Sequence, residues 1–178
     1  ADSMVRRSLS TSAYNERRSQ CEQAVSVLQS HNPEIQALRD ANLTLLNAHR
    51  EEMSDIVYRR ARHVITENAR VLKFSRELYR GNLEDVGGML VEGHRSLRDD
   101  YEVSVPELDT LVEAAVEVEG CYGARLTGAG FGGCIVALAD DDAVPDVQAH
   151  LNTVYEAAHG KQPTVYVTRP ANGVARMA

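Results

Sequence analysis

The stretch that decides the fold is GARLTGAGFGGC, residues 123–134. Glycine stands at positions 128, 130, 132 and 133, and short apolar runs flank this segment at 122–127 and 134–139. Apolar runs of this length bounded by turn residues are typical of buried strands. The pattern therefore predicts two strands joined by a glycine-rich turn.

The glycine-rich turn has two possible uses. Glycine adopts positive φ without steric cost, and successive N–H groups in such a turn form a concave nest that suits phosphate oxygens. The segment is not the dinucleotide fingerprint, because a strand follows it instead of a helix, and it is not a P-loop, because no Gly-Lys-Ser/Thr follows. From the residues alone, a ligand-free hairpin connection stays an equal alternative.

Upstream of the turn the chain has helical periodicity. Apolar residues recur at helical spacing from about residue 10 to His31, over 53–79, over 83–97 and from Pro106 towards Gly120, with a less regular stretch at 34–52. Within 53–79 one face is expected to carry Ala61, Ile65, Leu72 and Tyr79. Downstream, a helix is expected at 143–159, a strand at Thr164–Thr168, and a short last strand near 172–177. This order predicts an α+β domain in which helices pack on one face of a small, mostly antiparallel sheet.

Helix boundaries are marked by specific residues. Gly81 and Gly160 are expected to end the helices that precede them. Asn82 is expected to cap the next helix, and Ser104 with Glu107 is expected to form a capping box.

Composition restricts the function classes. The chain has 178 residues, which suits one compact domain, and 43% of them are hydrophobic. A net charge of -7 disfavours non-specific binding to nucleic acid or to an anionic membrane. No apolar run approaches the roughly 20 residues of a membrane span. Three cysteines without metal-ligand spacing favour a reducing compartment, so we expect a cytoplasmic protein.

Several polar residues have a functional and an ordinary interpretation. His63 and Glu67, one helical turn apart, could bind a metal, but a solvated helix contact is favoured. His94 falls on an apolar face, so a hydrogen-bonded core histidine is favoured over a catalytic base. Cys134 is expected to be a small buried residue, not a nucleophile. For Arg95, Arg98, Asp99 and Asp100 we expect structural salt bridges.

Three stretches together resemble one family. LTGAGFGGC at 126–134 resembles the third motif of the galactokinases, sugar kinases of the GHMP superfamily. SAYNERRSQCE at 12–22 resembles the family's Tyr-Asn-x-Arg-Arg-x-Gln-Cys-Glu segment, and HRSLRDDYEVS at 94–104, followed by PELD at 106–109, resembles a further signature. The resemblance runs in order over almost the whole chain. Ala129 departs from it, because the family commonly has Gly there.

The resemblance implies a fold and a division of labour. Residues 1–178 would form a single GHMP-kinase C-terminal-type domain with a ferredoxin-like element and a helix-rich N-terminal part. The family's catalytic, ATP-binding half lies upstream of the matching region. This chain would therefore hold no catalytic residue and no metal ligand, and it would be inactive alone.

The resemblance also implies substrates and site residues. Galactokinases transfer the γ-phosphoryl of MgATP to the anomeric hydroxyl of α-D-galactose and form galactose 1-phosphate. ATP and Mg²⁺ would act in the full-length enzyme, with neither held tightly by this chain, and galactose and ATP would be engaged through the upstream domain. Tyr14 matches the tyrosine that contacts galactose. The glycine-rich loop would line the cleft between the two domains with Thr127, Gly128, Ala129, Gly130, Phe131, Gly132 and Gly133.

Two alternatives remain open. The parent protein could be a related GHMP kinase with another substrate, such as N-acetylgalactosamine, or a non-catalytic sugar sensor or interaction module. An inter-domain face left exposed near Tyr14 and Phe131 would also allow self-association.

Overall fold

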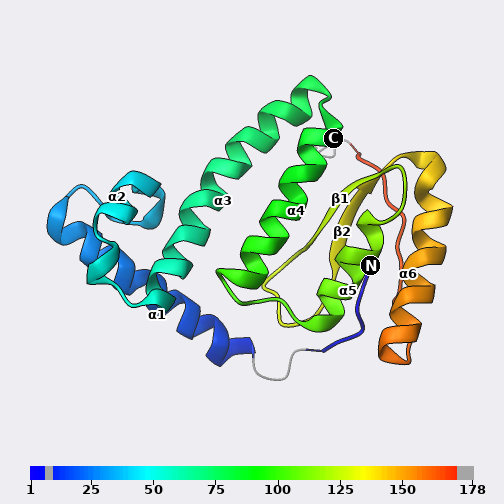
Figure 1. Cartoon of the computed structure of the whole chain (residues 1–178), viewed down its shortest axis with the longest axis horizontal. Coiled ribbons are helices and arrows are strands. Elements are labelled where there is room, and N and C mark those ends of the chain that lie inside the picture. Colours follow the sequence, from blue (N-terminus) through cyan, green and yellow to red (C-terminus); the bar gives the residue numbers. More distant parts are fainter. Residues whose placement is uncertain (7–9, 172–178) are drawn as a thin grey trace, which may run out of the picture.

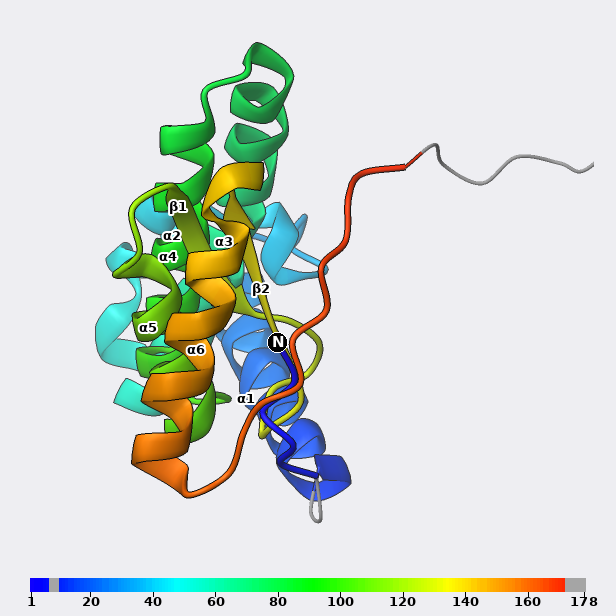
Figure 2. The same cartoon turned by 90° about the vertical axis from the view of Figure 1, so that its right-hand side faces the viewer.

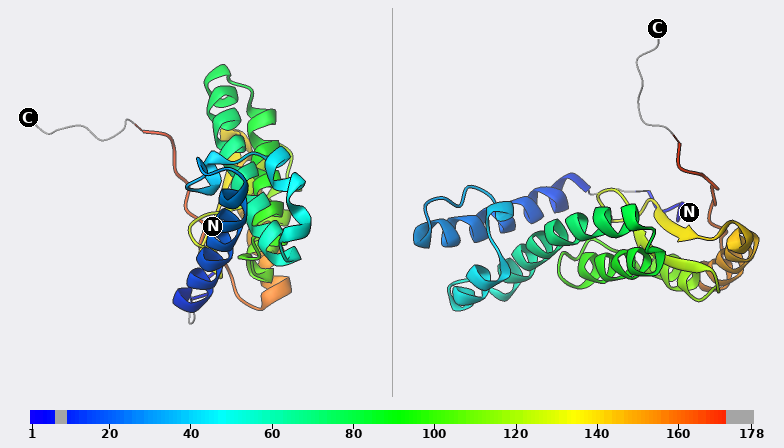
Figure 3. Two further views of the ribbon diagram at one scale, coloured as in Figure 1. Left: turned by 90° about the vertical axis from the view of Figure 1, so that its left-hand side faces the viewer. Right: turned by 90° about the horizontal axis from the view of Figure 1, so that it is seen from above.

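The structure is a computed structural model that describes residues 1–6 and 10–171. Its helices and two strands are arranged in a row (Figure 1). Seen from above, α1 and α2 lie at one end, α3 and α4 in the middle, and α6 at the other end (Figure 3). The described helices include none that is long and apolar enough to cross a bilayer.

Residues 10–80 form helices joined by short turns. They contain α1 (Ser10–His31), the short 3-10 helix η1 (Leu38–Asp40), α2 (Leu43–Ala48), η2 (Arg50–Glu52) and α3 (Asp55–Arg80). Leu28, Leu46 and Ile65, with 0%, 0% and 6% of their surface exposed, belong to one hydrophobic cluster that joins these elements. The irregular stretch expected at 34–52 is thus a series of short helices around that cluster.

The turn between α3 and α4 (Leu83–Asp99) follows the sequence signals in part. Gly81 caps α3 with φ of 77°, as expected. Asn82 occupies the N-cap position of α4, but its side chain makes no capping hydrogen bond. Its Nδ2 donates to Glu77 Oε2 at 2.7 Å. The predicted N-cap residue is therefore confirmed by its position, but the expected capping hydrogen bond from its side chain is not formed.

The next helix, α5 (Pro106–Val116), begins without the expected capping box. Val105 is its N-cap residue, and Ser104 Oγ donates to Asp109 Oδ1 at 2.5 Å. The helix ends before Gly120, which has φ of 86° in the turn that leads to the sheet.

The predicted hairpin is present. Strand β1 (Cys121–Leu126) pairs antiparallel with β2 (Ile135–Ala139), and Leu126 lies opposite Ile135. Ala124, Leu126, Ile135 and Ala137 belong to the second hydrophobic cluster, whereas Val136 is 47% exposed. The rest of this cluster comes mainly from α5 and α6 (Val144–His159), which cover one face of the sheet as predicted, and α4 contributes Leu97. Helix α6 follows the 3-10 turn η3 (Asp141–Ala143) and ends at Gly160, where φ is 65°.

The N-terminal stretch extends the sheet. Asp2 forms isolated antiparallel bridges with Cys134 and with Thr164, so it lies between β2 and the segment that follows α6 (Figure 2). The strand predicted at Thr164–Thr168 is therefore reduced to one bridge at Thr164, and the prediction of a full strand was wrong. The last short strand, expected at 172–177, falls outside the described residues.

Two residues of α3 are not where the periodicity placed them. Leu72 and Tyr79 share a face with the buried Ala61 and Ile65 in the helical pattern, yet they are 75% and 95% exposed. The C-terminal half of α3 projects beyond the helices that cover its first half (Figure 1). An amphipathic pattern reports which face is apolar, and it cannot report how far along the helix that face is covered.

The closest approach between a helix and the sheet occurs at two glycines. A Cβ at Gly87 of α4 would lie 1.9 Å from the carbonyl oxygen of Tyr122, and a Cβ at Gly123 of β1 would lie 2.1 Å from the carbonyl oxygen of Gly87. Real Cβ atoms do not come this close to backbone, so α4 and β1 can meet here only because both side chains are absent. The neighbouring Gly88 has nothing within 4 Å of its Cβ position.

These two adjacent glycines give a matched prediction. Gly87→Ala should lower the free energy of unfolding by about 3 kcal/mol or more, because the methyl group forces α4 away from the sheet. Gly88→Ala should raise it by roughly 0.5–1 kcal/mol, the usual gain inside a helix. Urea unfolding followed by circular dichroism measures both, and equal effects of the two variants would contradict the packing described here.

Candidate functional site

The glycine-rich loop at 127–134 is closed at its base and rigidly shaped. Thr127 N–H donates to Cys134 C=O at 2.9 Å, which continues the β1–β2 pairing by one step. Positive φ angles occur at Gly128 (81°), Gly130 (79°), Gly132 (117°) and Gly133 (82°). Ala129 is not among the residues with positive φ, so the backbone accepts alanine at the position where the resembling family commonly has glycine.

Phe131 carries backbone strain. Its φ is 59°, a conformation that costs a non-glycine residue about 1–3 kcal/mol. Its N–H donates to Val103 C=O at 2.7 Å, and its half-buried ring packs against the second hydrophobic cluster. A Cβ at Gly130 would lie 2.2 Å from the same Val103 oxygen, so that glycine is required for the loop to meet the segment after α4.

The other side of the loop is fastened to the N-terminal stretch. Ser3 N–H donates to Gly133 C=O at 2.9 Å, and Gly133 N–H donates to Val5 C=O at 3.2 Å. A Cβ at Gly132 would lie 2.6 Å from the Val5 oxygen. The loop is thus held between two segments that are far apart in sequence.

The tip of the loop faces outward. Thr127, Gly128 and Ala129 are exposed. Within the described part of the chain, the N–H groups of Gly128 and Ala129 donate to no acceptor. Two free backbone donors on a rigid, exposed glycine turn can bind the oxygens of a phosphate or of a sugar hydroxyl.

Tyr14 lies in the first turns of α1 with 58% of its surface exposed. One turn further along, the buried Arg17 donates from Nε to Tyr101 C=O at 2.6 Å and from Nη2 to Glu102 C=O at 3.0 Å. The start of α1 and the glycine-rich loop are therefore attached to one segment, residues 101–103. Four pockets of about 200 to 490 Å³ open on the described surface, and neither Tyr14 nor residues 127–133 line them.

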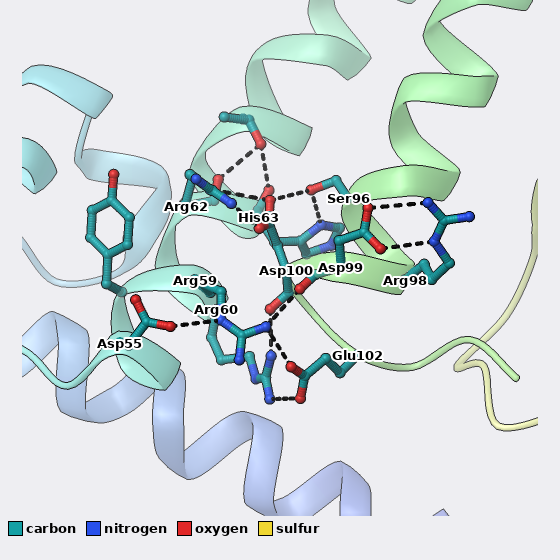
Figure 4. Close-up of polar contacts among 12 residues, drawn as sticks. Asp55, Arg59, Arg60, Arg62, His63, Ser96, Arg98, Asp99, Asp100 and Glu102 are labelled. Atoms are coloured by element: carbon teal, nitrogen blue, oxygen red, sulfur yellow. Dashed lines mark hydrogen bonds and ion pairs between the residues drawn. The ribbon is translucent and has the colours of Figure 1, made fainter.

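The 99–103 segment is itself fixed by arginines of α3 (Figure 4). Arg60 is 2% exposed and donates to Gln20 Oε1 at 2.9 Å, to Asp100 C=O at 2.5 Å and to Glu102 Oε2 at 2.6 Å. Arg59 pairs with the other oxygen of the same carboxylate. These bonds hold Glu102 at φ of 52°, another strained backbone position. Helical periodicity carries no signal for a buried arginine, so this role of Arg59 and Arg60 could not be predicted from their spacing.

A second arm of this network reaches α4 (Figure 4). Arg62 pairs with Asp100, whose Oδ2 also accepts from Ser96 Oγ at 3.2 Å. Ser96 Oγ lies 2.9 Å from Nδ1 of His63. Arg98 pairs with Asp99 at 2.8 Å. The structural salt bridges expected for Arg98, Asp99 and Asp100 are confirmed, whereas Arg95 forms none with the described residues.

His94 is a hydrogen-bonded core histidine, as predicted. It is 2% exposed, its Nε2 lies 3.0 Å from Asp109 Oδ1, and its Nδ1 accepts the N–H of Leu126 at 3.3 Å. Hydrogen bonds from His94 and Ser104 lower the pKa of Asp109 even though burial opposes this. Because Leu126 is the last residue of β1, His94 positions the strand that leads into the loop.

The interpretation of His63 and Glu67 as a solvated pair was wrong. His63 is 5% exposed and stacks on Tyr101 with ring centroids 4.6 Å apart. Glu67 accepts from Arg125 and from Arg70. Arg70 and Arg125 pair with the carboxylate of Glu67, and the imidazole of His63 is buried between α3 and α4.

Burial of His63 predicts a pH dependence of stability. Burial lowers the pKa of His63 from 6.5 to about 4, so the unfolded chain binds this proton first as the pH falls. The neutral ring contributes about 3 kcal/mol to the free energy of unfolding. This contribution is fully present above pH 6.5 and is lost as the pH falls from about 6.5 to 4.

The measurement is urea unfolding at several pH values between 7 and 5, above the range in which carboxylates titrate. The wild-type free energy of unfolding should fall across this range, and the slope should be smaller in His63→Gln. The same slope in both proteins would show that His63 does not carry the effect.

Comparison with known proteins agrees with this geometry. Residues 74–157, which run from the end of α3 through most of α6, match the family model described as GHMP kinases C terminal. This part of the chain carries a GHMP kinase C-terminal domain. The chain is 46% identical over 176 residues to a galactokinase of Roseiflexus sp. (strain RS-1). Its fold matches the crystal structure of Lactococcus lactis galactokinase complexed with galactose with a TM-score of 0.88 and 37% identity over 93% of the chain.

The matches cover less than half of those proteins. The chain spans 45% of the length of the Roseiflexus protein and 42% of the Lactococcus chain. The similarity extends over 99% of the present chain, so the helical part upstream of residue 74 is also related to galactokinases.

Proposed function

We propose that this chain is the C-terminal half of a galactokinase, which transfers the γ-phosphoryl of MgATP to the anomeric hydroxyl of α-D-galactose. The observation that carries the proposal is the outward-facing glycine loop, with free N–H groups at Gly128 and Ala129 on a backbone fastened at Val103 and Val5. A fastened, exposed donor array is what one wall of a two-domain cleft requires. The galactokinase relatives give the substrate pair.

In this proposal the residues of the chain bind and orient. The exposed phenol of Tyr14 offers a ring face and a hydroxyl to the sugar, and the loop from Thr127 to Gly133 faces the substrates across the cleft. Phosphoryl transfer depends mostly on positioning and on stabilisation of charge, so a pre-shaped loop contributes without reacting.

The segment that anchors the loop is not suited to bind a metal ion. Glu102 belongs to the segment that anchors the loop, and both its oxygens are taken by Arg59 and Arg60. We therefore propose that Mg²⁺, most ATP contacts and the catalytic groups belong to the other half of the enzyme. We propose further that residues 1–178 form one domain and that the isolated chain is inactive.

The three cysteines are free, which suits the cytoplasm proposed for this enzyme. Self-association of the isolated chain would use exposed apolar surface. Tyr14 contributes to such a surface, but Leu72 and Tyr79 of α3 are more exposed, at 75% and 95%.

The deciding experiment is a coupled ADP-release assay with MgATP and a sugar panel. The full-length parent should turn over galactose in preference to N-acetylgalactosamine, and the 178-residue chain should release no ADP. Turnover of another sugar by the parent would assign a different GHMP kinase, and no turnover at all would favour a sugar sensor. Normal turnover by the chain alone would place catalytic groups within it and contradict the division proposed here.

The role of Tyr14 is tested in the full-length parent. Tyr14→Phe removes one hydrogen-bonding hydroxyl worth about 1 kcal/mol, so kcat/KM for galactose should fall about fivefold, mainly through a higher KM. The KM for ATP should not change. Tyr79→Phe, at a tyrosine that is 95% exposed, is the matched control and should behave as wild type. If the two variants had equal kinetics, Tyr14 would not be part of the sugar site.

A further inference from the structure

Two histidines and one glutamate converge at the opposite end of α1 from Tyr14. His31 is the last residue of α1, His49 follows α2, and Glu52 ends η2. His31 Nε2 and His49 Nδ1 each lie 2.8 Å from a different oxygen of Glu52. The two rings stack with centroids 3.6 Å apart and an angle of 15° between their planes.

We propose that His31, His49 and Glu52 form a binding site for a divalent transition-metal ion of the zinc class. One nitrogen of each ring and one carboxylate oxygen lie within 4.8 Å of one another. Two ligands at about 2.1 Å from one ion are about 3.0–3.4 Å apart for angles between 90° and 109°. The two present 2.8 Å contacts join the rings to different oxygens of Glu52. Side-chain rotation must therefore bring one atom of each residue to these separations and turn the stacked rings so that both nitrogens point at the ion.

The backbone positions of all three residues are fixed by the core. His31 comes three residues after Leu28, His49 comes three residues after Leu46, and Glu52 precedes Met53. These three apolar residues are 0%, 0% and 7% exposed and belong to one hydrophobic cluster. The three ligands are therefore presented by rigid backbone, although they come from separate elements.

The chemistry of the ligands selects the ion. Imidazole nitrogen suits zinc, copper and nickel, whereas Mg²⁺ and Ca²⁺ prefer oxygen ligands. The nearby cation, Arg50, is already engaged, because it donates to Asp55 at 2.6 Å and lies over the ring of Tyr58. The side chains of His31 and Glu52 are 37% and 48% exposed, so solvent and ions reach the site, and water can complete the coordination.

The site is separate from the proposed sugar and phosphate region. His31 comes 17 positions after Tyr14 in α1, which corresponds to about 25 Å along the helix. The inference therefore does not rest on the galactokinase proposal. A bound ion would tie the end of α1 to the connection between α2 and α3 and would stabilise this end of the molecule.

The test is calorimetric titration of the tag-free 178-residue chain with Zn²⁺, without nucleotide or sugar, and with Mg²⁺ as a second titrant. One Zn²⁺ per chain should bind, Mg²⁺ should not compete, and the melting temperature should rise with Zn²⁺. Bound Co²⁺ should give the visible absorption of a site with nitrogen ligands. His49→Ala and Glu52→Gln should each weaken Zn²⁺ binding at least tenfold.

A matched control is available on the surface. His150 Nε2 lies 2.8 Å from Glu117 Oε2, which is a comparable pair without a third ligand, so His150→Ala should bind Zn²⁺ as wild type does. Absence of saturable Zn²⁺ binding would overturn the proposal. Equal affinity in His49→Ala and wild type would also overturn it, because the ion would then lie elsewhere. Circular dichroism without metal checks that the variants at these exposed positions are folded.

Discussion

The buried guanidinium of Arg60 is the interaction on which the rest of the arrangement depends. It connects α1 through Gln20, belongs itself to α3, and holds the segment after α4 through Asp100 and Glu102. An arginine that is 2% exposed is tolerated only because its donors are matched by acceptors in a fixed geometry. The same segment then accepts Arg17 on one side and Phe131 on the other. These hydrogen bonds around Arg60 therefore set the position of Tyr14 relative to the glycine-rich loop.

The two hydrophobic clusters explain why a polar connection is needed. One cluster joins α1, α2 and α3, and the other joins the sheet to α4, α5 and α6. Hydrophobic contact is non-directional and sets no unique angle between two such bodies. The charged hydrogen bonds between α3 and residues 99–102 are directional, and they fix the angle at which the two clusters meet.

Sequence reasoning succeeded where local signals decide the structure. The helices, the hairpin, the αL positions at Gly81 and Gly160 and the core role of His94 follow from periodicity, from glycine stereochemistry and from the apolar face of α4. It failed where a specific side-chain partner overrides the usual local preference. Asn82 bonds to Glu77 instead of capping α4, and Ser104 bonds to Asp109 instead of closing a capping box. His63, which looks solvated in sequence, is covered by Tyr101 from a loop 38 positions later. The candidate site was found through a resemblance, since a glycine-rich turn by itself has no unique function.

The docking of the N-terminal stretch has a consequence for the order of folding. Asp2 pairs with Thr164, and the glycine-rich loop is completed only when residues 3 and 5 bind Gly133. During synthesis at about 5–20 residues per second, these first residues wait on the order of 10 s for their partners to emerge. The α1–α3 cluster is built from residues 24–65 and can form within that interval. The glycine-rich loop is thus the last part of the described chain to acquire its shape, after the α1–α3 cluster is already in place.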